Sequence, residues 1–263
     1  MTHYRSKPLD KHGRIRWSAE ENRIWHDLIH RQHKRVENRA CDAYLSGLAM
    51  LDLPTSKAPQ LSDINHVLKA QTGWQVVPVP ALIDFEHFFA LLAAKQFPVA
   101  TFLRSRDEFD YLQEPDFFHE VFGHCAMLTH HDFAHFTQVY GQLGEHASHT
   151  QRVYLARLYW FTVEFGLVKQ KGECKIYGGG ILSSPGETVY ALESPEPERA
   201  AFDLQTVLRT PYRIDIMQPV YFVLEDIAQL YRLTCLDVMN QVNQAIRLGL
   251  LPARFKSKEV NHA

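Results

Sequence analysis

The stretch EPDFFHEVFGHCAML, residues 114–128, places two histidines on one predicted helix near the middle of the chain. Pro115 suits the first turn of this helix, and His119 and His124 follow, with Glu120 beside the first of them. Each helical residue turns the chain by about 100°, so side chains five residues apart point about 140° away from each other. The spacing disfavours an ordinary HExxH zinc helix, in which the histidines lie about 40° apart. Both imidazoles reach one ion if it lies at the helix edge, or if a π-bulge near Gly123 distorts the turn.

A second stretch, YWFTVEFGLV at 159–168, places Glu164 inside an almost unbroken aromatic and aliphatic run. An ionised carboxylate buried there without a partner is costly, so Glu164 must be neutral, pair with a cation or bind a metal. Two histidines and one carboxylate form the facial triad of non-haem Fe(II) oxygenases, and the same ligands also suit zinc. The residues alone leave three interpretations open: a catalytic metal site, a structural metal site, or core histidines beside a salt-bridged glutamate.

The regions around these two stretches predict mostly helices. Ser18 and Glu21 form a capping-box pattern that starts one long helix, which ends before Pro54. Further helices are expected from Ser62 to Gly73, after the caps Asp84 and Asp132, over about 150–168, after Ser184-Pro185 with Glu187 as the capping-box acid, and over about 226–248. Short strands or extended segments are expected at 74–80, 97–102, 175–178, 212–217 and 221–225. Long helices with a few short β-strands predict a mainly α protein and exclude a doubly wound sheet.

The composition indicates a globular protein. Lys+Arg 28 against Asp+Glu 30 gives a net charge of −2, which excludes a polybasic nucleic-acid binder. The first sixteen residues contain no signal-peptide pattern, and no window reaches the roughly 18 apolar residues of a membrane span. Four widely separated cysteines without a CxxC pair suit a reducing compartment (Cys41, Cys125, Cys174 and Cys235). We therefore expect a cytoplasmic protein with no nucleic-acid or membrane partner.

Several residue groups have a plain interpretation beside a functional one. His130, His131 and His135 surround an expected loop and are interpreted as solvated or capping residues. The run Gly178–Gly180 lacks a phosphate-binding motif and indicates a tight turn or a close backbone approach. Arg104 follows a predicted strand, where it can bind a substrate carboxylate bidentately or form a surface ion pair. The basic side of the first helix is interpreted as a solvated face (Arg31, Lys34, Arg35 and Arg39).

Five separated blocks together resemble the catalytic domain of the pterin-dependent aromatic amino acid hydroxylases. They follow the family's order within about residues 74–225: PVATFLRSR (98–106), YLQEPDFFHEVFGH (111–124), LYWFTVEFGL (158–167), IYGGGILSSPGE (176–187) and RTPYRIDIMQPVYFV (209–223). The resemblance implies one catalytic domain over 1–263, with a flexible N-terminal tail at 1–16 and no regulatory domain. It also implies a monomer, because the family's C-terminal tetramerisation extension is absent.

Carried over residue by residue, the resemblance implies Fe(II) held by His119, His124 and Glu164. It implies a substrate site in which Arg104 binds the amino acid carboxylate, with further positions at Pro115, Asp116, Trp160, Phe165, Gly180 and Ser183. It implies a tetrahydropterin cofactor, tetrahydrobiopterin or a relative, stacked on Phe88 and close to Glu120 and Tyr159. Catalytic roles are expected for Glu120, Tyr159 and Ser183, and Ser183 and Glu187 are expected to orient an imidazole ligand. The match weakens at Leu112, where animal members carry a threonine at the carboxylate site.

The implied reaction is hydroxylation of L-phenylalanine to L-tyrosine with O2 and a tetrahydropterin at a mononuclear non-haem Fe(II) centre. Two other classes of function stay open on the residues alone. One is a zinc hydrolase with Glu120 as general base, against which the five-residue histidine spacing weighs. The other is a non-catalytic module stabilised by a metal.

Overall fold

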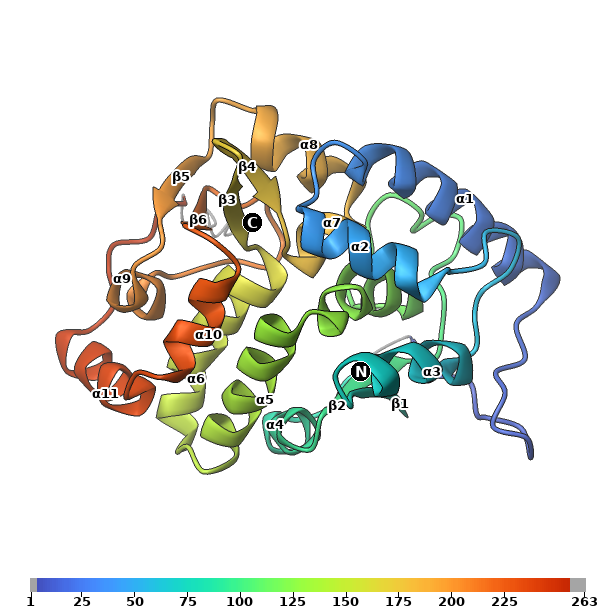
Figure 1. The fold of residues 1–263 in the computed structure, drawn as a ribbon, viewed down its shortest axis with the longest axis horizontal. Coiled ribbons are helices and arrows are strands. Elements are labelled where there is room, and N and C mark those ends of the chain that lie inside the picture. Colours follow the sequence, from blue (N-terminus) through green and yellow to red (C-terminus); the bar gives the residue numbers. More distant parts are fainter. Residues whose placement is uncertain (1–3, 256–263) are drawn as a thin grey trace, which may run out of the picture.

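Helices make up most of the regular structure in the computed structural model, which describes residues 4–255 (Figure 1). The α-helices are α1 (Ala19–Val36), α2 (Asp42–Leu51), α3 (Leu61–Gln71), α4 (Phe85–Ala93), α5 (His131–Glu145), α6 (His149–Tyr159), α7 (Gly179–Ser183), α8 (Pro185–Glu193), α9 (Leu204–Arg209), α10 (Ala228–Thr234) and α11 (Val238–Leu248). Two π-helical turns, η1 (His119–Cys125) and η3 (Trp160–Glu164), and a 3-10 turn, η2 (Met127–Thr129), complete the helical part. The mainly α class with a few short strands is confirmed.

The strands of the described chain form two small sheets. β1 (Gln75–Val79) and β2 (Gln96–Ala100) pair in parallel, with Gln75 opposite Gln96. The second sheet has the order β4-β3-β6-β5, built from β3 (Leu167–Gln170), β4 (Glu173–Ile176), β5 (Glu198–Ala201) and β6 (Val220–Leu224). β3 and β4 are antiparallel, whereas β3 and β5 each pair with β6 in parallel. In the view of Figure 1, the four-stranded sheet lies at the upper left and the β1–β2 pair lies lower and to the right, with α5 between them.

The prediction of one long first helix is wrong, because the structure has two separate helices, α1 and α2, over that stretch. The Ser18 capping box starts α1 as predicted, but α1 ends at Val36. In the link, Ile176 donates its backbone N–H to Arg39 O, and Cys41 donates to Ile176 O, both at 2.9 Å. This pairing with the end of β4 engages the Arg39 carbonyl and the Cys41 N–H outside the helix, which the hydrophobic periodicity cannot reveal.

The helices expected over 150–168 and 226–248 are also interrupted. α6 passes into η3 and then into β3, and α10 ends at Thr234 before Asp237 caps α11 by accepting from Asn240 N. Residues 212–217, expected as a strand, form an irregular segment. Asp132, expected as the N-cap of α5, lies in the first turn of that helix. The N-cap residue is His130, whose side chain forms no capping hydrogen bond. His131 and His135 are exposed, which agrees with their interpretation as solvated residues.

Residues 4–16, which belong to the segment expected as a flexible tail, form hydrogen bonds to the end of β1 and to the residue that follows β2. Lys7 donates its backbone N–H to Thr101 O at 2.9 Å, and Ser6 Oγ donates to Val79 O at 2.7 Å. Ile15 is buried. The expectation therefore differs from the structure over these residues, and residues 1–3 lie outside the described part of the chain.

Aromatic packing fixes the start of η1 in the core. Trp25 of α1 is fully buried and packs against Phe117 and Phe118, with ring centroids 5.9 and 5.6 Å away. Phe118 stacks on Phe122 one turn later at 5.0 Å, and Tyr44 of α2 donates its hydroxyl to Phe122 O at 2.7 Å. Rings on one side of η1 thus hold it in place, so its other side is free to carry functional groups.

Within residues 4–255, the structure contains no helix that is both long enough and apolar enough to cross a bilayer.

Candidate active site

His119 and His124 lie on η1, a π-helical turn of the kind considered for the region near Gly123. A π-helix closes its backbone hydrogen bonds from residue i to residue i+5, so side chains five apart share one face. The two rings meet with centroids 4.8 Å apart, and their Nε2 atoms are 3.1 Å apart. The spacing that disfavours a regular zinc-protease helix therefore brings both imidazoles to one point.

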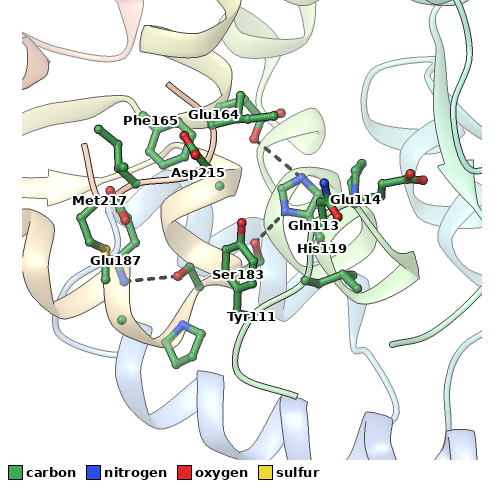
Figure 2. Close-up of a pocket in the computed structure, with 18 of the residues that line it drawn as sticks. Tyr111, Gln113, Glu114, His119, Glu164, Phe165, Ser183, Glu187, Asp215 and Met217 are labelled. Carbon is green, nitrogen blue, oxygen red and sulfur yellow. Dashed lines mark hydrogen bonds and ion pairs between the residues drawn. The ribbon is translucent and has the colours of Figure 1, made fainter. Parts of the chain in front are cut away.

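Glu164 reaches the same point from η3, the second π-helical turn. Its Oε1 lies 3.3 Å from His124 Nε2, and its Oε2 lies 3.7 Å from His119 Nε2. Figure 2 shows Glu164 and His119 turned toward each other. The apolar run that predicts a carboxylate in need of a partner thus places that carboxylate beside two imidazoles.

Ser183, on α7, determines which nitrogen of His119 faces this point. Ser183 Oγ lies 2.8 Å from His119 Nδ1 and donates to Gly179 O at 2.9 Å (Figure 2). Because the hydroxyl proton is used by Gly179, the serine oxygen accepts from Nδ1–H, and the Nε2 lone pair is left free. Burial lowers the pKa of His119 to about 4, so the ring is neutral at pH 7 and suited to be a ligand.

The spacing of these three groups fits a divalent transition-metal ion. Donor atoms about 2.1 Å from a metal lie about 3 Å apart when they occupy adjacent corners of an octahedron. The separations here are 3.1, 3.3 and 3.7 Å. Three donors on one side leave the remaining corners of such an ion open, which is the arrangement that non-haem iron oxygenases use.

A second carboxylate, Glu120, also has an oxygen within 4.8 Å of both imidazoles. Burial raises the pKa of Glu120 well above its usual value, and the charges of Glu164 and Asp116 raise it further. Burial acts in the same direction on Glu164, but attraction to His124 and His119 outweighs it and lowers the pKa of Glu164. The surroundings of Glu164 thus favour its ionised form, which is the form suited to bind a metal, whereas those of Glu120 favour the neutral form.

The glycine run Gly178–Gly180 brings α7 against both ligand-bearing turns. A Cβ added to Gly179 would lie 2.4 Å from Cε1 of His124, and one added to Gly180 would lie 3.0 Å from Oε2 of Glu164. A Cβ on Gly123 of η1 would in turn lie 2.7 Å from Gly179 O. The run therefore marks a close backbone approach, which confirms that interpretation of the sequence.

Arg104 and Asp116 form a buried ion pair at the start of η1. Arg104 Nε and Nη2 donate to the two carboxylate oxygens of Asp116, each at 2.9 Å, and the backbone N–H groups of Arg104 and His119 each donate to it at 3.0 Å. Burial alone would raise the pKa of Asp116, but Arg104 outweighs burial and lowers it. Arg104 thus forms a buried rather than a surface ion pair, and its Nη1 has no hydrogen bond to the described residues.

A cavity of about 600 Å³, lined in part by His119 and Glu164, opens beside these side chains, and its volume is typical of small-molecule sites. Trp160 and Phe165 form an aromatic wall, with ring centroids 4.5 Å apart. The predicted substrate residues that line the cavity are Arg104, Pro115, Trp160, Phe165, Gly180 and Ser183. Asp116, expected among them, is fully buried behind Arg104 and does not line the cavity, so its place in the structure is that of a positioning residue.

The predicted pterin residues, Phe88, Glu120 and Tyr159, do not line this cavity. Phe88 of α4 packs edge-on against Tyr159 of α6, with ring centroids 5.3 Å apart. Burial raises the pKa of Tyr159, and the nearby carboxylates of Glu164 and Glu120 raise it further. Tyr159 thus connects Phe88 with the side chains of Glu120 and Glu164.

Part of the cavity wall carries no clear signal in the sequence. Residues 110–114 and 214–217 line it, and Leu112 places an apolar side chain where the family's threonine is expected. Arg31, expected on a solvated face of α1, instead pairs with Asp110 and donates to Phe109 O at 3.1 Å. Arg35 likewise donates to Pro185 O at 3.0 Å. Side chains on the basic side of α1 thus support two parts of the wall.

A buried polar network fixes the irregular segment 212–217. Gln218 Nε2 donates to Arg213 O at 2.9 Å and to Ile216 O at 3.0 Å, and its Oε1 accepts from Trp160 Nε1 at 3.0 Å. Glu187 Oε1 accepts from Gln218 N at 3.0 Å and from the hydroxyl of Tyr221. The Glu187 carboxylate is therefore not the capping-box acid of α8, and it binds Gln218 and Tyr221 rather than His119. Residues 212–217 form hydrogen bonds to Gln218 instead of pairing as the expected strand.

Known proteins show the same architecture. A family model described as biopterin-dependent aromatic amino acid hydroxylase matches residues 2–245. The phenylalanine-4-hydroxylase of Vibrio cholerae is 66% identical over 100% of this chain and 91% of its own length. The solved apo phenylalanine hydroxylase of Colwellia psychrerythraea is 55% identical, with a TM-score of 0.93 over 95% of this chain and 97% of that one. The Chromobacterium violaceum enzyme, solved with bound oxidised Fe(III), is 41% identical, with a TM-score of 0.88 over 93% and 89%. The family match covers nearly the whole chain, and this chain belongs to the biopterin-dependent aromatic amino acid hydroxylase family.

Proposed function

We propose that this protein hydroxylates L-phenylalanine to L-tyrosine, using O2 and a tetrahydropterin such as tetrahydrobiopterin at a mononuclear Fe(II) centre. The observation that carries the proposal is the convergence of His119, His124 and Glu164 beside an aromatic cavity that also contains a guanidinium group. The close similarity to bacterial phenylalanine hydroxylases, one of them solved with iron, supports both the substrate and the metal.

His119, His124 and Glu164 would hold the iron. When bound, the iron activates O2 together with the tetrahydropterin, which supplies two electrons. Ser183 keeps His119 in the tautomer whose Nε2 is free, and Gly179 and Gly180 let α7 approach the ligands closely. The protein thereby presents a preformed set of donors, so little rearrangement is needed when the metal binds.

Arg104 and the aromatic wall would orient the amino acid. Arg104 is held by Asp116 and lines the cavity, where its guanidinium can bind the substrate carboxylate. Trp160 and Phe165 offer ring faces for the phenyl group and exclude water around it. With its carboxylate bound by Arg104 and its phenyl ring packed on Trp160 and Phe165, the substrate would present one defined edge of that ring to the proposed metal ligands.

The pterin would lie beside Phe88, Tyr159 and Glu120. Phe88 offers an aromatic face for stacking, and its edge-on contact with Tyr159 fixes its orientation. Burial raises the pKa of Glu120 well above its usual value and so favours its protonated form, which can donate a hydrogen bond to a ring nitrogen or oxygen. The raised pKa of Glu120 weighs against the zinc hydrolase alternative, because a general base must be ionised to accept a proton.

We also propose that the protein acts as a monomer in the cytoplasm. All four cysteines are free thiols, and Cys41 and Cys125 are buried, which suits a reducing compartment. Analytical ultracentrifugation of the iron-loaded protein is expected to give a species of about 30 kDa, the mass of one chain. A dimer or tetramer at micromolar concentration would contradict the monomer.

A product assay tests the proposed function most simply. The iron-loaded protein is supplied with O2, tetrahydrobiopterin and phenylalanine, tyrosine or tryptophan in separate reactions. We expect tyrosine from phenylalanine with the highest kcat/KM of the three, and no tyrosine when iron, O2 or pterin is left out. Higher kcat/KM for tryptophan or tyrosine would contradict the assigned substrate.

In the same assay, Arg104→Lys tests the carboxylate role. Lysine keeps the charge but loses the planar fork that binds a carboxylate through two hydrogen bonds. The KM for phenylalanine is expected to rise about tenfold or more, whereas the KM for the pterin changes little. Equal increases in both KM values would contradict the role assigned to Arg104.

A further inference from the structure

A second cavity, of about 470 Å³, lies on the other side of the segment that closes the first. It is lined by Phe85 of α4, by Val153, Ala156 and Arg157 of α6, and by residues 211–215. Ile214 and Asp215 line both cavities. Tyr212 of the second cavity stacks on Trp160 of the first, with ring centroids 4.5 Å apart and planes 17° apart. A ligand in the second cavity would therefore touch the wall of the active site.

Arg157 is the notable polar group of this second cavity. Its Nη1 donates to Val153 O at 2.8 Å, and its guanidinium lies over the Tyr154 ring at 4.9 Å. Its Nε is buried without a hydrogen-bond partner, and within residues 4–255 no carboxylate forms an ion pair with it. A half-buried guanidinium normally has a counter-ion, because burial disfavours its charge. Burial lowers the pKa of Arg157, in agreement with this environment.

The other charges of the second cavity balance each other. Arg213 donates to both carboxylate oxygens of Asp215, at 2.9 and 2.8 Å, so this pair contributes no net charge. Counted over the described residues that line it, the cavity then carries a charge of +1, from Arg157. The remaining lining is aromatic or aliphatic, apart from the Tyr212 hydroxyl. The cavity thus combines one unpaired cation with apolar walls, a combination that suits a small anion or the anionic end of a larger ligand.

We propose that the second cavity is an anion subsite in which Arg157 binds a carboxylate or phosphate group. Such a group has two sources: a free small anion, or the side chain of the tetrahydropterin. Phe85 precedes Phe88 by three residues on α4, and Ala156 precedes Tyr159 by three residues on α6, so the second cavity lies about one helical turn from the proposed pterin group. The pterin side chain as the source of the anion rests on the proposed function, whereas a free small anion does not.

Titration of inorganic phosphate into the iron-loaded protein, followed by calorimetry under anaerobic conditions, tests the subsite itself. Wild type is expected to bind phosphate about tenfold more tightly than Arg157→Gln, whereas Arg157→Lys keeps part of the affinity. Any binding of phosphate to the iron is common to all variants and cancels in the comparison. Arg247→Gln, which removes an exposed arginine of α11, is the matched control and should match wild type.

The source of the anion is tested with two tetrahydropterins that differ only in a phosphate ester at the end of the C6 side chain. If the pterin side chain occupies the subsite, the KM of wild type for the phosphorylated pterin is about tenfold lower than its KM for the unphosphorylated one. In Arg157→Gln the ratio of these two KM values should approach one. If phosphate binding depends on Arg157 but the KM ratio does not, the anion is a free molecule that binds beside the active site.

Phosphate binding that is equal in wild type and Arg157→Gln, together with an unchanged KM ratio, would overturn the proposal. Circular dichroism and thermal unfolding establish that each variant is folded before it is compared. A protein without hydroxylase activity that still binds phosphate through Arg157 would contradict the proposed function and leave the anion subsite standing. Failure of the anion subsite and failure of the proposed hydroxylase function are therefore distinguishable.

Discussion

Ser183 is the residue through which α7 determines the state of a proposed metal ligand. Its hydroxyl lies between His119 Nδ1 and Gly179 O, so removing it leaves the imidazole free to rotate or to change tautomer. We predict that Ser183→Ala lowers the affinity for Fe(II) by about tenfold or more, since loss of such orienting partners typically costs 10–100-fold.

The neighbouring Ser184 is a matched control for Ser183→Ala. Its side chain caps α8 by accepting from Glu187 N at 3.2 Å, so Ser184→Ala should cost about 1 kcal/mol of stability and leave the iron affinity within about twofold of wild type. Competition with a chromogenic chelator measures both affinities. An equal loss of Fe(II) affinity in Ser183→Ala and Ser184→Ala would show that Ser183 has no specific effect on His119.

The ion pair between Arg104 and Asp116 makes a prediction about stability and pH. Asp116→Asn leaves a buried guanidinium unpaired, and we expect the free energy of unfolding at pH 7 to fall by about 3 kcal/mol. The pKa of Asp116 is lowered in the folded state. Its contribution to stability is therefore complete above its unfolded pKa of about 3.9 and is lost as the pH falls through the folded value.

Urea unfolding between pH 7 and pH 3.5 measures this contribution. The difference between wild type and Asp116→Asn should be constant down to about pH 4.5 and then shrink. A difference that stays the same at every pH would contradict the assigned protonation of Asp116.

At this scale the sequence singles out three side chains that the structure brings together. His119, His124 and Glu164 are conspicuous because two imidazoles share a short segment and a carboxylate stands in an apolar run. Gln218 is missed, because a single glutamine after an irregular segment has no periodic pattern to mark it. Asp116 is placed in the substrate site by resemblance, whereas its full burial behind Arg104 emerges only from tertiary packing.

At the scale of elements, two π-helical turns and one glycine-rich helix build the proposed metal site. η1 brings residues five apart onto one face, η3 turns Glu164 inward, and α7 fits closely against both. We predict that Gly179→Ala greatly weakens or abolishes Fe(II) binding, because its methyl group would lie 2.4 Å from the buried His124 ring.

Gly186→Ala is the control for Gly179→Ala. A Cβ at Gly186 would lie 2.8 Å from Cε of Met217, the flexible end of a partly exposed side chain, which can move away. Iron titration of both variants measures the effect. Full iron binding by Gly179→Ala would show that α7 does not constrain the His124 ring.

The positions of most elements follow from caps, proline and periodicity, whereas their ends follow from tertiary contacts. Ser18, Asp84 and Ser184 cap helices as predicted. The break between α1 and α2 depends on pairing with Ile176, a residue more than a hundred positions away. The irregular segment 212–217 depends on the buried network around Gln218, so its alternating pattern is misleading.

At the scale of the whole molecule, metal binding should stabilise the fold. The proposed ligands come from two turns far apart in the chain, so an ion that joins them binds the folded state and not the unfolded chain. Free Fe(II) at a hundred times its Kd is expected to add about 2.7 kcal/mol. We predict that chelation lowers the Tm by roughly 5–10 °C, measured by anaerobic calorimetry. An unchanged Tm after complete iron removal would contradict a site that bridges η1 and η3.

The identity of the carboxylate ligand tests the account most directly, because Glu120 and Glu164 both lie near the two imidazoles. The decisive measurement is the amount of iron bound per chain, by elemental analysis after anaerobic loading and desalting, in wild type, Glu164→Gln and Glu120→Gln. The account predicts about one iron per chain in wild type and Glu120→Gln, and little in Glu164→Gln. Full iron binding by Glu164→Gln together with loss in Glu120→Gln would contradict it.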